Sequence, residues 1–70
     1  MNILVFKTDL QNQQQLGHIG PALSMHPQII RWNVDLEDCD SILRVVPGNV
    51  SAKEVEQILV RAGHHCEELV

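Results

Sequence analysis

The sequence is poor in aromatic residues, in cations and in long hydrophobic runs. Its 70 residues include one Phe, one Trp and no Tyr, so it lacks the set of aromatic rings on which RNA-recognition domains stack bases. Five Lys and Arg stand against nine Asp and Glu, giving a formal net charge of −4. The longest apolar run is residues 3–6, far short of the roughly 20 residues that span a bilayer. Neither a nucleic-acid surface nor a membrane span is therefore predicted.

Cysteine is scarce as well. Cys39 and Cys66 are the only two, and in a reducing compartment such a pair is more often two free thiols than a disulfide. The N-terminus has no basic region followed by an apolar stretch of signal-peptide length, which predicts a cytoplasmic protein. With 44% hydrophobic and 20% charged residues, the composition is typical of a folded domain. Residues 1–70 are predicted to form one domain with one core.

The first of two predicted helices has conflicting signals. Its apolar stripe consists of Leu16, Ile19 and Leu23. Asp9 precedes the stripe at a helix N-cap or loop position. Glycine costs about 1 kcal/mol inside a helix and proline about 3 kcal/mol. Gly17 and Pro21 therefore predict a kink or a shortened first turn near Gly17, with Pro21 heading the better-formed half.

The second predicted helix has clearer ends. Ser51 and Glu54 have the spacing of a capping box, and Gly63 supplies a C-terminal stop. Between them, one apolar face consists of Val55, Ile58, Leu59 and Ala62. Four further segments have the composition of strands: residues 2–8, 28–36, 41–46 and 64–70.

Alternation in the second strand predicts one buried face, made of Ile30, Trp32, Val34 and Leu36. Phe6 and Cys66 are predicted to face the same core. The order strand, helix, strand, strand, helix, strand predicts an α+β, ferredoxin-like βαββαβ fold. In that fold a four-stranded antiparallel sheet carries two helices on one face. Because many unrelated functions share this topology, it says little about activity.

Four short motifs occur in order along the chain: residues 19–23 (IGPAL), 32–37 (WNVDLE), 46–47 (VP) and 55–69 (VEQILVRAGHHCEEL). Their order and spacing resemble the heavy-metal-associated (HMA) family, the fold of copper chaperones. That family carries Met-x-Cys-x-x-Cys before its first helix. The resemblance puts Leu10 on the methionine, and Asn12 and Gln15 on the two cysteines. Hard amide oxygens do not replace thiolates around Cu(I), so the resemblance implies a degenerate site, with no metal ligand and no cofactor expected.

The predicted topology brings three connections together at one end of the sheet. It places Asp9, Asn12 and Gln15 near His64, with residues 38–40 at the same end towards the opposite edge. The simpler interpretation is a solvated polar loop, in which substitutions at Asn12, Gln15 or His64 leave stability unchanged. The alternative is a metal site in which His64 acts with Asp9 or His18, since imidazole suits zinc, copper and nickel. By itself, His18 is typical of a surface histidine.

Two functional hypotheses follow. The first is a non-enzymatic interaction module that contacts a protein partner through the loop end or through the open sheet face. That face carries Arg31, Asn33, Asp35 and Arg44. The second is a copper-chaperone-like protein that binds or transports a heavy-metal ion, using His64 and its neighbours in place of the cysteine pair. No enzyme activity is expected, because the loop after the first strand lacks the arginine that acylphosphatase chemistry needs, and neither cysteine has the surroundings of a nucleophile.

Overall fold

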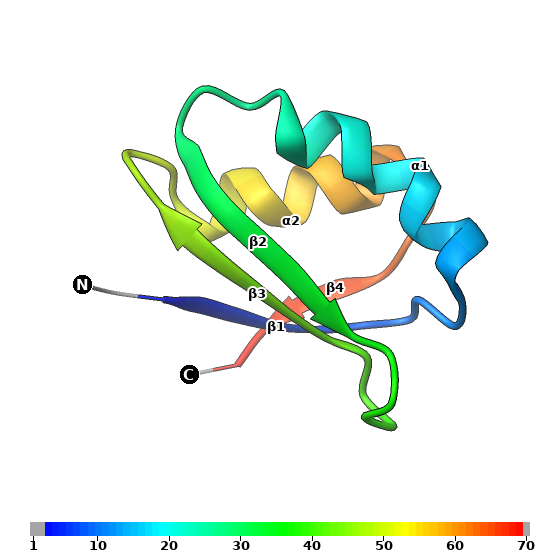
Figure 1. Ribbon diagram of the computed structural model, residues 1–70. Coiled ribbons are helices and arrows are strands. Elements are labelled where there is room, and N and C mark those ends of the chain that lie inside the picture. Colours follow the sequence, from blue (N-terminus) through cyan, green and yellow to red (C-terminus); the bar gives the residue numbers. More distant parts are fainter. Residues whose placement is uncertain (1–2, 70) are drawn as a thin grey trace.

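Strand β1 (Leu4–Thr8) is an inner strand of the sheet, and its Val, Phe and Thr favour a strand. The computed structural model describes residues 3–69, which form an antiparallel four-stranded sheet in the order β2-β3-β1-β4. The other elements are α1 (Gln13–Ser24), β2 (Ile29–Asp35), β3 (Ile42–Pro47), α2 (Ala52–Arg61) and β4 (Cys66–Glu68). Figure 1 shows both helices on one face of the sheet, which confirms the predicted ferredoxin-like α+β fold. Residues 2 and 70 of the predicted strands lie outside the described residues.

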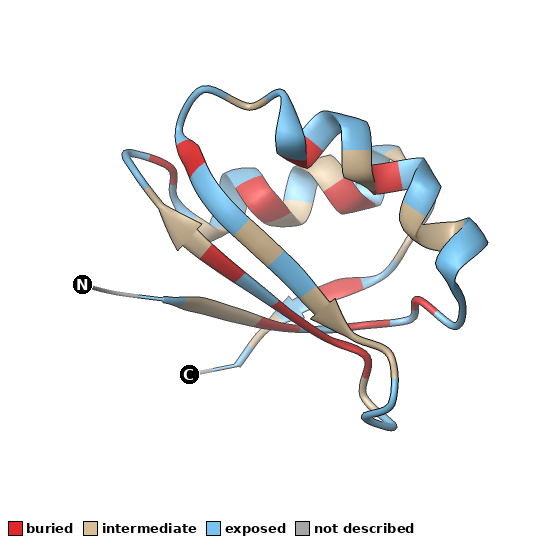
Figure 2. Cartoon of the chain, in the orientation of Figure 1, coloured by how far each residue is buried: buried red, intermediate tan, exposed pale blue. Residues whose placement is uncertain are grey.

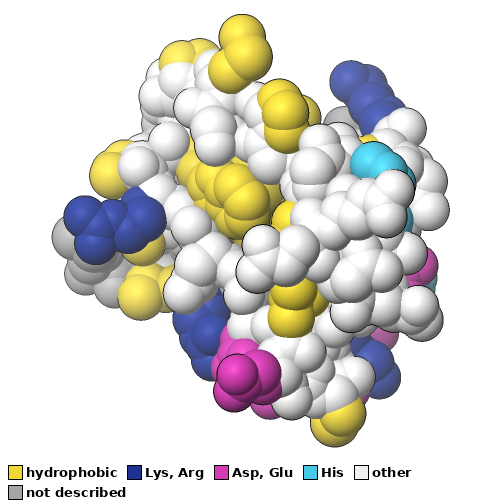
Figure 3. Space-filling view, turned by 45° about the vertical axis from the view of Figure 1, so that its right-hand side comes forward, with side chains coloured by type: hydrophobic (Ala, Val, Ile, Leu, Met, Phe, Trp, Pro, Cys, Tyr) yellow, Lys and Arg dark blue, Asp and Glu magenta, His cyan; other side chains and the backbone are white. Residues whose placement is uncertain are grey.

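The core fills the space between the sheet and the helices, where the buried residues of both layers face each other (Figure 2). Its fully enclosed side chains are Phe6, Leu10, Ile19, Leu23, Leu43, Val45, Val55 and Leu59. Each such side chain contributes about 1.5–3 kcal/mol by leaving water. The cover is incomplete at one side, since hydrophobic side chains remain visible in a hollow in Figure 3. Trp32 and Val34 of the edge strand β2 are only half-buried.

Helix α1 runs without interruption through Gly17, so the prediction that it would be shortened there is wrong. A side chain at Gly17 would meet nothing within 4 Å, because this residue faces solvent. On the opposite face, Ile19 and Leu23 are wholly buried. Burial of two large side chains outweighs the roughly 1 kcal/mol cost of a helical glycine. Pro21 also lies inside the helix, at an exposed position. Packing therefore decides the helix against its local propensity.

The same helix packs closely on β2 through Trp32. A Cβ atom at Gly20 would lie 3.6 Å from the indole ring, which is ordinary contact distance. The indole N–H donates a hydrogen bond to the Ser24 hydroxyl at 3.1 Å. Because Gly20 has no side chain, α1 packs directly against the Trp32 ring. The hydrogen bond from the ring to Ser24 fixes the end of the helix.

Strand β2 departs from the predicted alternation at its start. Trp32 and Val34 face the core as predicted, but the register shifts by one residue between Ile29 and Arg31. Ile30 is the extra residue of this bulge. As a result Ile29 is buried and Ile30 is 69% exposed, so the prediction that Ile30 faces the core is wrong. A bulge of this kind depends on strand pairing, which a pattern of alternation does not encode.

Helix α2 has the predicted ends. The Ser51 hydroxyl accepts a hydrogen bond from the Glu54 N–H at 3.3 Å. At the other end, the His64 N–H donates to the Leu59 carbonyl at 2.9 Å, and the Gly63 N–H donates to the Val60 carbonyl at 3.0 Å. These two bonds form a Schellman motif around Gly63, whose φ of 87° suits glycine. The motif fixes the backbone of His64, the first residue after it.

Candidate functional site

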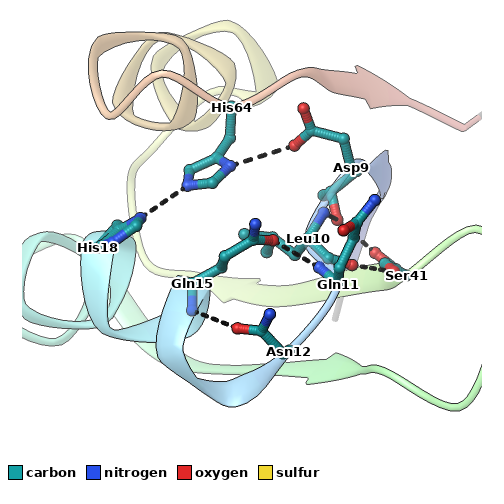
Figure 4. A network of polar contacts seen from close by, with 9 residues as sticks. Asp9, Leu10, Gln11, Asn12, Gln15, His18, Ser41 and His64 are labelled. Atoms are coloured by element: carbon teal, nitrogen blue, oxygen red, sulfur yellow. Dashed lines mark hydrogen bonds and ion pairs between the residues drawn. The ribbon is translucent and has the colours of Figure 1, made fainter.

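The segment between β1 and α1, residues 9–12, is held by hydrogen bonds around Leu10 (Figure 4). The Thr8 hydroxyl donates to the Ser41 carbonyl at 2.6 Å and accepts from the Leu10 N–H at 3.3 Å. The Ser41 hydroxyl donates to the Leu10 carbonyl. Thr8, Leu10 and Ser41 are all buried, so these bonds pair polar groups that are costly to leave unsatisfied. Buried hydrogen bonds therefore hold the backbone of the segment in place, while Asp9, Gln11 and Asn12 stay exposed.

Asn12 and Gln15, which the sequence resemblance puts on the cysteine positions, close the N-terminus of α1. Asn12 is the N-cap, and its Oδ1 accepts from the Gln15 N–H at 3.0 Å. The Gln15 side chain reaches back, and its Oε1 accepts from the Gln11 N–H at 2.7 Å. This reciprocal arrangement is close to a capping box. Both amide oxygens thus satisfy backbone N–H groups. These two hydrogen bonds argue against the expectation that substitutions at Asn12 or Gln15 leave stability unchanged, which stays a prediction.

His64 lies between Asp9 and His18 (Figure 4). Its Nδ1 is 3.3 Å from Asp9 Oδ1, and its Nε2 is 3.1 Å from His18 Nδ1. The two imidazole rings stack, with centroids 5.4 Å apart and planes 22° from parallel. A neutral imidazole donates from one nitrogen and accepts at the other. When the Nδ1–H of His64 donates to Asp9, its Nε2 therefore accepts from His18. The predicted proximity of Asp9 and His64 is confirmed.

Three separate segments supply this chain of contacts. Asp9 follows β1, His18 lies on α1, and His64 follows the Schellman motif of α2. His64 has a side chain only 9% exposed, whereas that of Asp9 is 50% exposed. The interpretation of His18 as an ordinary surface histidine missed its contact with His64. The sequence contained one indication of this contact. Gln15 was predicted to lie near His64, and a spacing of three residues puts His18 on the same side of the helix as Gln15.

The chemistry open to these three side chains follows from their geometry. Asp9 and His18 contact opposite nitrogens of the His64 ring, so the three do not converge on one point. A metal site needs several ligand atoms around a common centre. An ion held here would have to replace at least one of the two hydrogen bonds. As it stands, the arrangement orders His64 and links the β1–α1 segment to both helices.

A second group lies in the hairpin turn. Ligand atoms of Asp38, Cys39 and Asp40 lie within 4.8 Å of one another. The Asp38 carboxylate accepts from the Asp40 N–H at 2.8 Å, and Asp40 also pairs with Lys7 at 3.7 Å. The Thr8 N–H donates to the Asp40 carbonyl at 3.1 Å, which puts the turn at the predicted end of the sheet. In Figure 3, Asp and Glu side chains are visible near the lower end and, in a smaller patch, at the right edge beside histidine. Turn geometry explains this cluster.

The two cysteines are both free, as predicted, and differ in environment. Cys39 is exposed in the hairpin turn, whereas Cys66 is buried in β4. Burial raises the pKa of the Cys66 thiol to about 12, and the charges of Glu56 and Asp9 add to the effect. Cys66 is therefore a neutral core thiol at physiological pH. It occupies the predicted inward position and behaves as a small apolar side chain.

Solved structures share this arrangement of helices and strands, although the sequence matches no protein-family model and no curated protein. One is the copper(I)-loaded first domain of the human copper chaperone for SOD1 (CCS), with a TM-score of 0.79 at 20% identity over 94% of this chain and 89% of that chain. The yeast copper transporter domain Ccc2a gives 0.84 at 17% identity over 100% and 97%. The N-terminal domain of PacS from Synechocystis gives 0.81 at 14% identity over 100% of both chains. The chain has an HMA-like, copper-chaperone-like fold.

The likeness of this HMA-like chain to its structural neighbours shows the fold alone, because their identities are between 14% and 20%. The HMA-like fold places the β1–α1 segment beside the residue that follows α2, and here those places hold Asp9 and His64. No helix within residues 3–69 is both long and apolar enough to cross a membrane.

Proposed function

We propose that this HMA-like chain is a non-enzymatic interaction module that contacts a protein partner and has lost the paired-thiolate site of the family. The observation that supports this proposal most directly is the use of Asn12 and Gln15. Each directs its side-chain oxygen to a backbone N–H at the start of α1. A soft Cu(I) ion selects thiolate ligands, and these amides are neither soft nor free.

The loop end is suited to protein contact because it is ordered before any partner arrives. Asp9 and Asn12 are exposed and Gln15 is half-buried at the same end, where the His64 side chain is 9% exposed. The hydrogen bonds of Leu10 and of the N-cap hold the backbone beneath them. A preformed surface loses less conformational entropy on association than a mobile one. We propose that Asp9, Asn12, Gln15 and His64 form this loop surface.

A second candidate function is metal carriage through histidine. The observation that favours it is the 3.1 Å separation of His18 Nδ1 and His64 Nε2, since neutral imidazole is a ligand for zinc, copper and nickel. Against it stands the position of Asp9 on the other side of the His64 ring. This candidate requires the His18–His64 hydrogen bond to open so that both nitrogens turn towards one ion.

Native mass spectrometry of the reduced protein, offered Cu(I), Zn(II) and Ni(II) in turn with a competing chelator, tests both candidates. A variant carrying Asn12→Cys and Gln15→Cys serves as positive control, because it restores the thiol pair on the same backbone. We expect the control to retain one Cu(I) and the wild-type chain to retain no ion. A one-to-one complex of the wild-type chain that disappears in His64→Ala would overturn the first proposal and establish the histidine carrier.

A further inference from the structure

The face of the sheet that the helices leave open carries two arginines on neighbouring strands. Arg31 and Asn33 of β2 pair with Val46 and Arg44 of β3, respectively. The two arginines therefore stand at diagonal positions of one antiparallel pair. Diagonal neighbours on one face are close enough for long side chains to act together. Both arginines are exposed.

These residues surround a shallow hollow of about 240 Å³, lined by Ile3, Arg31, Trp32, Asn33, Arg44 and Val46. Ligand pockets for small molecules and cofactors usually measure about 300–1,000 Å³, so the hollow is small for such a ligand. It is large enough to receive an apolar side chain from a partner. Ile3 forms an apolar wall of the hollow. It is 53% exposed, because nothing within residues 3–69 covers it.

The charge at the hollow is opposite to that of the chain as a whole. The formal net charge is −4, and Lys7 is already paired with Asp40. Within residues 3–69, neither Arg31 nor Arg44 takes part in an ion pair. A guanidinium group binds a carboxylate with two parallel hydrogen bonds. Two free guanidinium groups beside an apolar wall are complementary to an acidic segment that also carries an apolar side chain.

We propose that the open sheet face binds an acidic segment of a protein partner, with carboxylates on Arg31 and Arg44 and an apolar side chain in the hollow between them. This inference rests on the proposed function, that the chain works by contacting a protein, and it names the surface and the partner's chemistry. A nucleic acid is the poorer occupant. The rest of the acidic surface repels phosphates, and the one indole nitrogen is directed to Ser24 on the helix side.

A titration followed by NMR tests the proposal. The probe is a blocked synthetic peptide of alternating Glu and Val, added to ¹⁵N-labelled protein, with a Gln and Val peptide as its neutral counterpart. We expect shift changes in the backbone amides of Arg31, Asn33, Arg44 and Val46 with the acidic peptide alone. Because the contact is partly electrostatic, its affinity should fall as salt is raised.

Two matched variants separate specific contact from general charge. Arg31→Gln with Arg44→Gln removes the two cations of the hollow, and Lys53→Gln with Arg61→Gln removes two exposed cations of α2. Each pair lowers the formal net charge by two, from −4 to −6. We expect the first pair to weaken binding at least about tenfold. The second pair should weaken it less than about twofold, because α2 lies on the opposite face of the sheet and salt screens exposed charges that are not at the contact. Thermal melts confirm that both variants fold.

Several outcomes would overturn the proposal. Equal weakening by both variant pairs would mean that binding depends on the net charge of the protein and not on Arg31 and Arg44. Shift changes confined to Asp9, Asn12 and His64 would move the contact to the loop end. No shift at millimolar peptide would remove the surface altogether. Self-association that the Arg31 and Arg44 variant abolishes would make a second copy the occupant. If the peptide titration fails and native mass spectrometry finds no bound ion in the wild-type protein, only this binding surface is rejected. If native mass spectrometry finds a retained ion, the proposed function itself is rejected.

Discussion

The two helices of this domain reach the same packed state from very different local sequences. Helix α2 has a capping serine, an acidic first turn, a basic last turn and a glycine stop. Helix α1 has neither an acidic first turn nor a basic last turn, and it contains Pro21 and Gly17. Both helices nevertheless bury two residues completely, Ile19 and Leu23 in α1 and Val55 and Leu59 in α2. Helix α2 is therefore specified locally, whereas α1 depends on its contacts with the sheet and on the segment before it.

The largest effect is expected from truncating the buried leucine before α1. Leu10 and Leu59 are both wholly buried, so Leu10→Ala and Leu59→Ala should each lower the free energy of unfolding by about 2–5 kcal/mol. Urea denaturation of both variants measures the two values. Val60→Ala, at a position 61% exposed on α2, is the control and should cost less than about 0.5 kcal/mol. A loss for Leu10→Ala as small as that control would mean that the segment before α1 is not packed.

The strand after α2 gives a second test, through alkaline pH. The Cys66 thiol has a pKa raised from 9.0 to about 12, first by burial and then by Glu56 and Asp9. Since the folded pKa is the higher one, this contribution is complete below pH 9 and is lost as pH rises towards 12. Stability should fall by about 1.4 kcal/mol per pH unit in that window. Urea denaturation at a series of pH values should show this slope in wild type and in Cys39→Ala.

Cys66→Ala is the matched control for the alkaline slope, because it removes the titrating group from the same buried position. Its stability should depend less on pH between 9 and 12. Identical slopes in wild type and Cys66→Ala would mean that the thiol ionises as readily in the folded state as in the unfolded state. The same proteins also permit a labelling check, in which a thiol reagent should modify the exposed Cys39 well before Cys66.

The smallest effects concern the two helix caps. Asn12→Ala and Ser51→Ala should each cost about 1 kcal/mol, because each removes the acceptor for a backbone N–H at the start of its helix. Gln15→Ala should cost about 0.5 kcal/mol, since its bond to the Gln11 N–H is exposed. Thermal denaturation resolves such differences in a chain of this size. Asn12→Ser keeps an acceptor and should restore most of the lost stability. If Asn12→Ala left stability unchanged, α1 would not depend on its cap.

Most of the fold was predictable because it rests on periodicity. The stripe that ends in Leu59, the capping pair Ser51 and Glu54 and the alternation of Trp32 and Val34 are local patterns, and each led to the correct element. The bulge at Ile30 was not predictable, because it arises from pairing with β3. The uninterrupted α1 was missed because glycine and proline were weighed against propensity alone, without the burial of the opposite face.

The candidate site was only partly predictable. The topology was sufficient to bring Asp9 next to His64, because both follow elements that end at the same end of the sheet. It offered His18 only as an alternative to Asp9 and did not reveal that both contact His64 at once, since a helix face is fixed only when the helix is packed. Nor did it reveal the hydrogen bonds of Asn12 and Gln15, because the sequence offered Asp9 as a helix N-cap and the structure has Asn12 in that role. The pairing of Thr8 with Ser41 joins residues 33 positions apart and leaves no local pattern.

The order of elements, the faces that carry the core and the lack of cysteine in residues 9–18 follow from the sequence alone. These properties are written in the residue types and their spacing, through a period of two for strands and 3.6 for helices. The contacts of the polar side chains in this segment depend on the tertiary structure. Asn12 and Gln15 became caps, and His64 gained partners on both sides, because side-chain hydrogen bonds depend on distances that only the packed sheet and helices establish.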